Sequence, residues 1–358
     1  APPVDRAGRV AAHTAVPRMT DLSAAELTAV AEAMAAAGVP LVGPLAARPI
    51  VGGRSNLTFR LTDGEGRWVL RTAPRSGRTP SAHDVAREFR VTRALRGTGV
   101  PVPPAVLLHL EDDVLGSPFT VAEFVDGTCV QSRADLDELT DAVVHECGER
   151  LIQTLAALHA VRPETVGLED FGRRDGYAER QVRRWSGQWE IVGVPDLKSL
   201  AVETGRRLAG AVPEQRSSGI VHGDYRIDNT ILRLDGGVRV AAVVDWELST
   251  LGDPVADVAL MCVYRSPALD LVLGAPSAWT SDRIADADGL AAAYEAAGGV
   301  PLTDWDFHLA LGYFKLAVIA AGIDHRYRVG ATRGAGFDTA GQAVAPLLES
   351  AHRLAVTL

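Results

Sequence analysis

The spacing of apolar side chains along the chain changes twice, and each change predicts a different kind of element. Residues 1–19 are rich in Ala, Pro and Arg, and we expect them to form an irregular arm. Ser23 and Glu26 then have the spacing of a capping box ahead of an apolar run, which predicts a helix ending near Gly38. After it the period becomes two, which predicts short strands at 45–51, 57–62 and 67–72. The residues Asp63 to Gly66 favour a hairpin between the last two strands.

A helix and two more strands follow, and after them the predicted elements are mainly helices. Residues 82–96 place Val85, Phe89, Thr92 and Leu95 on one face, which predicts a helix. The Pro-rich segment 100–104 leads into strands at 105–110 and 118–125. Beyond Asp126-Gly127 we expect helices at 133–160, 177–190 and 197–211, strands at 219–222, 230–234 and 238–244, and mostly helices from 255 onward.

This order of elements predicts an α+β fold with two lobes. A small β-rich lobe at 1–126 precedes a larger, mainly helical lobe at 127–358, and no internal repeat is present. A cleft between two such lobes is the usual place for a ligand. We therefore expect nucleotide binding in the first lobe, and catalysis and acceptor binding in the second.

Composition and charge narrow the class of partner. Hydrophobic residues make up 47% and charged residues 23% of the 358 positions, which is typical of globular proteins. The 36 basic and 45 acidic residues give a net charge of -9, the wrong sign for binding a phosphate backbone. We interpret the charge as a solubility feature and expect no nucleic-acid partner.

The cysteines and the apolar runs indicate the cellular compartment in which we expect the protein. Cys129, Cys147 and Cys262 stand far apart, so they predict neither a zinc site nor a disulfide framework. No apolar run approaches the ~20 residues that a membrane span needs, and no export signal is visible at the first residues. We expect a cytoplasmic protein without a membrane partner.

The strongest chemical signal is the segment from His222 to Asn229, His-Gly-Asp-Tyr-Arg-Ile-Asp-Asn, with Asp245 following an apolar run 16 residues later. Phosphoryl transfer needs an oriented acceptor oxygen and metal ions that neutralise the phosphates. Asp224 offers a carboxylate for the acceptor hydroxyl, and Asn229 and Asp245 offer the oxygen ligands that Mg²⁺ prefers. The pattern therefore predicts an ATP- and magnesium-dependent phosphotransferase.

A glycine-containing turn between two predicted strands is a candidate phosphate loop. Gly52 and Gly53 would let backbone amides approach phosphates, while Ser55 and Asn56 could add side-chain donors. An ordinary hairpin turn is the alternative, and only the position of the segment favours the phosphate loop.

The motif around Asp224 resembles the aminoglycoside phosphotransferase and choline kinase family, which has the protein-kinase fold. The resemblance covers about residues 50–327. Four segments point to one subgroup of this family. They are Val69-Leu70-Arg71, 123–127 (Glu-Phe-Val-Asp-Gly), 245–254 (Asp-Trp-Glu-Leu-Ser-Thr-Leu-Gly-Asp-Pro) and Phe314-Lys315. These details look like the kinase-like domain found with acyl-CoA dehydrogenases in some large proteins, a subgroup associated with hydroxyacyl-CoA phosphorylation.

The resemblance implies roles for individual residues. Asp224 would be the catalytic base, and Asn229 and Asp245 the magnesium ligands. Arg226 stands where protein kinases carry a lysine that steadies the phosphoryl group; pairing with Asp228 is an equal alternative.

On the nucleotide side, Arg71 would contact the phosphates and be held by Glu88, although Arg75 competes for that role. The Glu123 carbonyl and the Val125 amide would bind the adenine edge, in a segment that an ordinary strand end would also explain. Asp257 and His222 are expected to be structural: Asp257 bracing backbone amides of the catalytic loop, His222 as an anchoring core histidine.

The acceptor stays open at this stage. A small-molecule hydroxyl is expected, either on a hydroxyacyl-CoA or on an aminoglycoside-like amino sugar. Five arginines (Arg173, Arg174, Arg180, Arg183 and Arg184) could meet coenzyme A phosphates or could form a solvated basic face. A nucleotide-binding pseudokinase is the alternative of a different class, and a protein kinase is disfavoured because no Ala-Pro-Glu follows Asp245.

Overall fold

The computed structural model describes residues 21–50, 56–73, 84–331 and 337–358. They group into two compact units, Ala1–Ala86 with Val106–Phe124, and Arg87–Ala105 with Val125–Leu358. The expected arm at 1–19 and the predicted site residues Gly52, Gly53, Ser55 and Arg75 lie outside the described residues.

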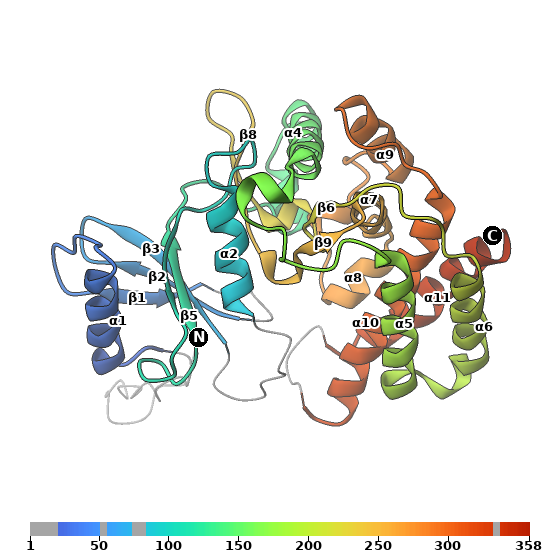
Figure 1. The fold of residues 1–358 in the computed structure, drawn as a ribbon, viewed down its shortest axis with the longest axis horizontal. Helices are drawn as coiled ribbons and strands as arrows, with labels where there is room; N and C mark the ends of the chain where they lie inside the picture. The colour runs from blue at the N-terminus through green and yellow to red at the C-terminus, as the bar shows by residue number, and fades with distance from the viewer. Residues whose placement is uncertain (1–20, 51–55, 74–83, 332–336) are drawn as a thin grey trace, which may run out of the picture. The chain divides into compact units, whose positions relative to one another are not determined.

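The first unit is an antiparallel sheet with one helix (Figure 1). The strands β1 (Ala46–Pro49), β2 (Leu57–Thr62), β3 (Arg67–Thr72), β4 (Ala105–His109) and β5 (Phe119–Glu123) have the order β1-β2-β3-β5-β4. Helix α1 (Ala24–Ala36) begins with the predicted capping box at Ser23. Its Met34 joins Phe59 and Leu70 of the sheet in one apolar core, so α1 covers a sheet face.

The predicted hairpin between β2 and β3 is confirmed, and Asp63 stabilises its turn. The Asp63 carboxylate accepts hydrogen bonds from the backbone N–H of Glu65 at 3.1 Å and of Gly66 at 2.7 Å. A third bond, from the Val42 N–H at 2.7 Å, ties the preceding loop to the turn. This bond is the main cause that lowers the pKa of Asp63.

Helix α2 (Val85–Leu95) falls almost entirely in the second unit, although the sequence placed residues up to 126 in the amino-terminal lobe. Its Arg87 donates to the carbonyls of Phe171 at 3.0 Å and Ser249 at 2.9 Å. Val91 and Leu95 belong to the core of that unit. Val91, rather than the expected Phe89, therefore lies on the buried face of α2.

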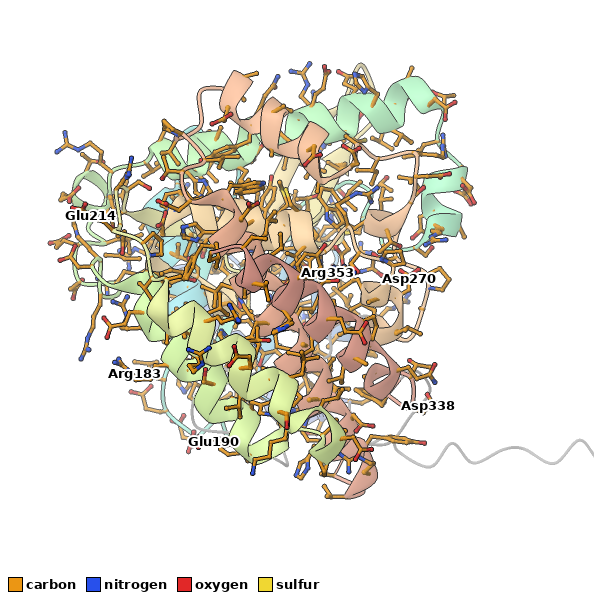
Figure 2. All side chains as sticks on the ribbon, turned by 90° about the vertical axis from the view of Figure 1, so that its right-hand side faces the viewer. Arg183, Glu190, Glu214, Asp270, Asp338 and Arg353 are labelled. Atoms are coloured by element: carbon orange, nitrogen blue, oxygen red, sulfur yellow. The ribbon has the colours of Figure 1, made fainter. Side chains whose placement is uncertain are left out.

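The second unit is mainly helical, with two pairs of short strands. Its helices are α3 (Arg133–Asp137), α4 (Asp141–Ala160), α5 (Tyr177–Val192), α6 (Lys198–Gly210), α7 (Pro254–Val263), α8 (Ala268–Leu273), α9 (Ala287–Ala296), α10 (Trp305–Arg328) and α11 (Ala340–Val356). The strand pairs are β6 (Gly219–Val221) with β9 (Thr250–Gly252), and β7 (Thr230–Arg233) with β8 (Arg239–Val243). Figure 2 shows the charged ends of Arg183 and Glu190 at the edge of this unit, turned away from its core.

Helix α10 is the centre of the helical layer. It packs against α11, α7, α5 and α6, and twelve of its residues are buried. By length and composition it is the one helix among the described residues that could cross a membrane, yet 67% of the relevant window is buried inside the molecule. A core helix has this property because both of its long faces meet apolar neighbours.

Two sequence predictions for this unit are corrected. The single helix expected at 133–160 is two helices, because Thr140 caps α4 by accepting a hydrogen bond from the Val143 N–H. Strand β9 was not predicted. Its three residues carry no alternation that marks a strand, and pairing with β6 creates it.

Candidate active site

The loop that follows β6 is anchored by His222, which is fully buried. The His222 Nε2 lies 3.0 Å from the carbonyl oxygen of Val244, which can only accept, so Nε2 carries the proton. Its Nδ1 then accepts the backbone N–H of Asp224 at 3.2 Å. Both ring nitrogens are thereby used by a neutral ring, and the expected anchoring role of His222 is confirmed.

Asp257, in the first turn of α7, braces the same loop. Its carboxylate accepts the backbone N–H of His222 at 2.7 Å and of Gly223 at 2.8 Å. His159 lies 3.3 Å away on its other side. Burial works to raise the pKa of Asp257, but the bond to His159 and the backbone hydrogen bond from His222 outweigh it and lower the pKa. The predicted bracing role is therefore confirmed.

The braced loop can only be closed by a glycine at position 223. Gly223 has a φ of 85°, and a Cβ there would lie 2.9 Å from the carbonyl oxygen of Leu248. Any other residue would be strained and would clash with backbone. The loop therefore turns at Gly223 and presents Asp224, which is half-buried.

Asn229 is bonded to Asp224. The Asn229 Nδ2 donates to the backbone carbonyl of Asp224 at 2.7 Å and to its Oδ2 at 3.0 Å. These two bonds use the nitrogen of the amide and leave Oδ1 as the atom that can act as a ligand. The 3₁₀ turn Ile227–Asn229 holds this geometry.

Asp245 follows β8 in a left-handed conformation, with φ of 67° and ψ of 57°. Such a backbone is uncommon outside glycine, costs about 1 kcal/mol or more, and often marks a functional position. The preceding Val244 N–H donates to the Asn229 carbonyl at 2.9 Å, so the hairpin of β7 and β8 brings Asp245 beside Asn229. The structure thus gathers Asp224, Asn229 and Asp245 in one place.

The donor set fits a metal that is bound together with phosphates. In the described part of the chain no group of three or more His, Cys, Asp or Glu side chains could hold a metal ion by itself. Asn229 and Asp245 would provide two oxygen ligands, and Mg²⁺ typically takes one or two protein ligands while phosphates and waters complete its shell.

Arg226 pairs with acids of its own loop. Its Nε lies 3.0 Å from Asp228 Oδ1 and its Nη2 lies 3.4 Å from Asp224 Oδ2. Burial works to lower the pKa of Arg226, but Asp224 and Asp228 outweigh it and raise the pKa. The pairing with Asp228 that the sequence offered as one alternative is present, and a role of Arg226 toward a phosphoryl group stays a prediction.

The nucleotide-binding residues predicted in the first part of the chain are only partly described. Asn56 is buried just before β2, and Arg71 is half-buried on β3 opposite Thr58 and Thr120. Arg71 belongs to the first unit, whereas Glu88 is buried on α2 in the second. The roles of Asn56, Arg71 and Glu88 stay predictions.

The predicted adenine-binding segment has a defined strand geometry. The Phe124 N–H donates to the Arg67 carbonyl of β3 at 3.0 Å. Because backbone groups alternate sides along an extended strand, those of Glu123 face away from β3. Val125 is the residue after Phe124 and belongs to the second unit. The binding of adenine by Glu123 and Val125 stays a prediction.

Two residues near Asp224 were missed by the sequence analysis. Tyr264 is buried, and the Arg226 guanidinium lies 4.8 Å from its ring centroid; burial first, and then Asp224, raise its pKa. Lys315 of α10 donates from Nζ to the Gly223 carbonyl at 3.4 Å. A basic residue inside the apolar run of α10 was the signal that could have identified Lys315.

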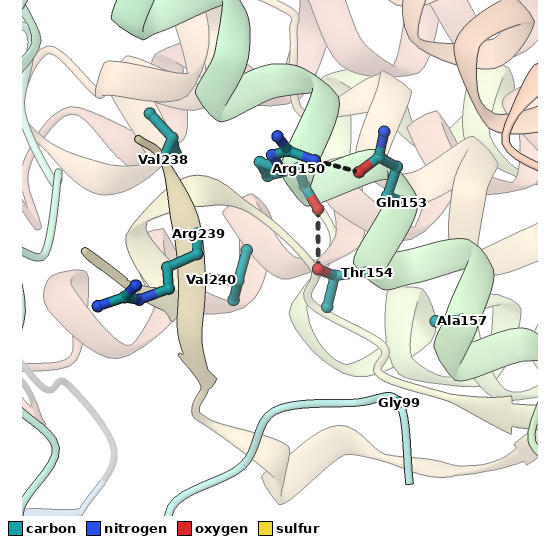
Figure 3. A pocket seen from close by; sticks show the side chains of 8 residues that line it. All are labelled: Gly99, Arg150, Gln153, Thr154, Ala157, Val238, Arg239 and Val240. Atoms are coloured by element: carbon teal, nitrogen blue, oxygen red, sulfur yellow. Dashed lines mark hydrogen bonds between the residues drawn. The ribbon is translucent and has the colours of Figure 1, made fainter. Parts of the chain in front are cut away.

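The second unit also contains a pocket away from the loop of Asp224. It measures about 390 Å³ and is lined by α4 and β8, including Arg150, Gln153, Thr154 and Arg239. Figure 3 shows Arg150 bonded to Gln153, and Thr154 bonded back to the carbonyl of Arg150. None of the predicted site residues that the structure describes lines this pocket.

Known proteins resemble this chain over most of its length. The sequence profile of the Phosphotransferase enzyme family matches residues 46–310. Acyl-CoA dehydrogenase family member 11 of Gallus gallus is 35% identical over 323 residues, covering 88% of this chain and 41% of that protein. The chain thus spans about two fifths of the length of this relative.

Solved structures share the fold. A protein of Ralstonia eutropha assigned as an aminoglycoside phosphotransferase is 30% identical, with a TM-score of 0.75 over 88% of this chain and 94% of that one. A mutant of aminoglycoside phosphotransferase APH(4)-Ia, in complex with AMP-PNP and hygromycin B, is 16% identical with a TM-score of 0.57, over 87% and 95% of the two chains. The predicted α+β protein-kinase-like fold is confirmed.

Proposed function

Because this chain belongs to the phosphotransferase enzyme family, we propose that it transfers the γ-phosphoryl group of ATP to a hydroxyl group of a small molecule. Asp224 accepts the proton of the acceptor hydroxyl. The acceptor oxygen forms a bond to the γ-phosphorus as the bond from phosphorus to the β–γ bridging oxygen breaks, and ADP leaves. The AMP-PNP complex of APH(4)-Ia supports ATP as the donor.

The observation that carries this proposal is the bond between Asn229 and Asp224. It holds the base and one metal ligand in a fixed relation, while Val244 binds the Asn229 carbonyl and brings Asp245 alongside. Asn229 and Asp245 would hold Mg²⁺, which neutralises phosphate charge when bound. A chain that only bound nucleotide would have no need of the carboxylate of Asp224.

For the acceptor we favour a hydroxyacyl-CoA thioester. The relative from Gallus gallus is named as an acyl-CoA dehydrogenase family member, and this name supports an acyl-CoA thioester as the acceptor. The structure also sorts the five arginines of the α5 region. Arg174 pairs with Glu164, Arg180 donates to backbone carbonyls, and Arg183 lies 3.7 Å from Glu179.

The remaining two arginines favour an anionic acceptor. In the described part of the chain, no carboxylate forms an ion pair with Arg173 or Arg184. Arg184 is exposed and lies over the ring of Trp185 at 5.3 Å. Such cations can meet the phosphates of coenzyme A, whereas a polycationic aminoglycoside would be repelled.

A coupled ADP-release assay tests the function. The protein is given Mg²⁺·ATP with a panel of 4-hydroxyacyl-CoA thioesters and a panel of aminoglycosides, and Asp224→Asn is the control. Turnover with hydroxyacyl-CoA that is lost in the control supports the proposal. Turnover of aminoglycosides alone would overturn the acceptor class, and ATP binding without turnover of any acceptor would favour a regulatory pseudokinase.

A further inference from the structure

The peptide group that joins Gly223 to Asp224 is held at both of its polar atoms. Its N–H, which belongs to Asp224, donates to His222 Nδ1 at 3.2 Å. Its carbonyl, which belongs to Gly223, accepts the Lys315 ammonium at 3.4 Å. Since a peptide group is planar, two contacts on opposite sides fix its rotation, and with it the direction in which the Asp224 side chain leaves the backbone.

Lys315 reaches this peptide from a helix far away in the sequence. It is half-buried on α10, where the apolar residues Phe314 and Leu316 on either side are buried. Its Nζ lies 5.8 Å from the ring centroid of Trp185 on α5. An ammonium has three N–H donors, and in the described residues one of them has a bonded partner, the Gly223 carbonyl.

A small cavity lies beside Lys315. It measures about 20 Å³ and is lined by residues of α5, α7, α10 and the loop, among them Gly223, His308 and Lys315. This volume is enough for one water molecule. His308 is 3% exposed and its Nδ1 has no partner in the described part of the chain.

The charges around Lys315 come from every element that packs on it. Burial is the largest influence and lowers the pKa of Lys315 to about 8, with Arg184 of α5 acting in the same direction. Asp224 of the loop and Asp257 of α7 oppose it. Tyr177 of α5 stays neutral because burial raises its pKa, and burial lowers the pKa of His308 on α10.

We propose that Lys315 is a positioning residue for Asp224: its ammonium fixes the Gly223 carbonyl, and through this peptide it aims the Asp224 carboxylate at the acceptor. The inference rests on the proposed function, because it assigns Lys315 a part in that same site. Lys315 touches neither nucleotide nor acceptor in this role. It acts in the protonated form, since an uncharged amine binds a carbonyl more weakly than an ammonium does.

The kinetic test uses the fact that the chain has two lysines, Lys198 and Lys315. Lys315→Met removes the ammonium and keeps the length of the side chain, and Lys198→Met makes the same change at an exposed position. With Mg²⁺·ATP and a 4-hydroxyacyl-CoA, we expect kcat of Lys315→Met to fall by about 10- to 100-fold while the KM for ATP changes less than about threefold. Lys198→Met should behave as wild type.

The pH profile separates positioning from a general structural effect. In the wild type kcat should decline above about pH 8 as Lys315 loses its proton. This decline should be absent in Lys315→Met, and in Lys315→Arg it should move to higher pH with part of the activity restored. An unchanged kcat in Lys315→Met, or a reduced kcat with the alkaline decline still present, would overturn the proposal.

A second measurement does not depend on turnover. With ¹³C at the lysine ε-carbons, the two lysine signals can be titrated by NMR in the intact protein. The Lys315 signal should titrate near pH 8, and Asp224→Asn should lower its midpoint further, because a facing negative charge is lost. A Lys315 midpoint near the ordinary lysine value of about 10.4, or one that does not respond to Asp224→Asn, would overturn the inference even if transfer occurs. A panel without turnover but with the expected titration would overturn the proposed function alone.

Discussion

The amide nitrogen of Asn229 donates to both the backbone carbonyl and the carboxylate of Asp224, at 2.7 and 3.0 Å. One side chain therefore orients the Asp224 carboxylate with its nitrogen, and its Oδ1 is not used in these two bonds. The spacing of five residues between Asp224 and Asn229 therefore predicts that the two side chains are in contact.

Replacing the base should remove turnover while ATP still binds. Asp224→Asn keeps the shape of the side chain but cannot accept the acceptor proton, so kcat should fall by about 10²- to 10⁴-fold. Phosphoryl transfer followed by ADP release checks this, with ATP binding measured by calorimetry. Asp235→Asn, at an exposed position, is the matched control and should keep full activity. Retained turnover in Asp224→Asn would contradict the assignment.

The tighter binding of ATP in the presence of Mg²⁺ should depend on Asp245. ATP should bind much more tightly with Mg²⁺ than without it, and Asp245→Asn should weaken only the metal-dependent part. Asn tolerates the left-handed backbone at this position, so the fold should persist. Calorimetry with and without Mg²⁺ measures both. Metal-independent ATP binding in the wild type would be evidence against a magnesium site at Asn229 and Asp245.

Substitutions of Arg71 and of Arg75 should have different effects on the kinetics with ATP. If Arg71 holds the phosphates, Arg71→Ala should raise the KM for ATP or lower kcat by about tenfold or more, with the fold intact. Arg75→Ala should have little effect. Steady-state kinetics at varied ATP, with circular dichroism of both variants, distinguishes them. The reverse pattern would show that Arg75 is the phosphate ligand.

Asp257→Asn should destabilise the second unit as well as the loop. Its buried carboxylate accepts two backbone N–H groups, and an amide can accept with one atom only, so we expect a loss of about 2–4 kcal/mol in the free energy of unfolding. Urea unfolding measures it.

The pH dependence of this loss has a definite sign. The pKa of Asp257 is lowered in the folded state, so its contribution is present above the unfolded pKa of about 3.9 and is lost as the pH falls below it. The difference between wild type and Asp257→Asn should therefore shrink below about pH 4. A difference that stayed constant across this range would contradict the role of the charged carboxylate.

The sequence determined those features whose cause is local. The capping box at Ser23 and the hairpin turn at Asp63 use residues within four positions of each other, so their letters predict their geometry. Asp224 and Asn229 are five positions apart, and one loop turn brings them together. The fold class also followed from the sequence, since alternation and helical spacing persist over whole elements.

Only the tertiary structure decided what depends on distant partners. Strand β9 exists through its pairing with β6, and Val91 rather than Phe89 is buried because the core of the second unit lies on that side of α2.

Lys315 is the clearest case of the difference. It lies 92 positions from Gly223, and no spacing rule connects a lysine of one helix to the carbonyl of a remote loop. The sequence specifies which groups must escape an apolar environment, here a charge within a buried helix. Where each finds its partner is settled by packing, because a buried polar group is stable only where a distant segment supplies its hydrogen bond.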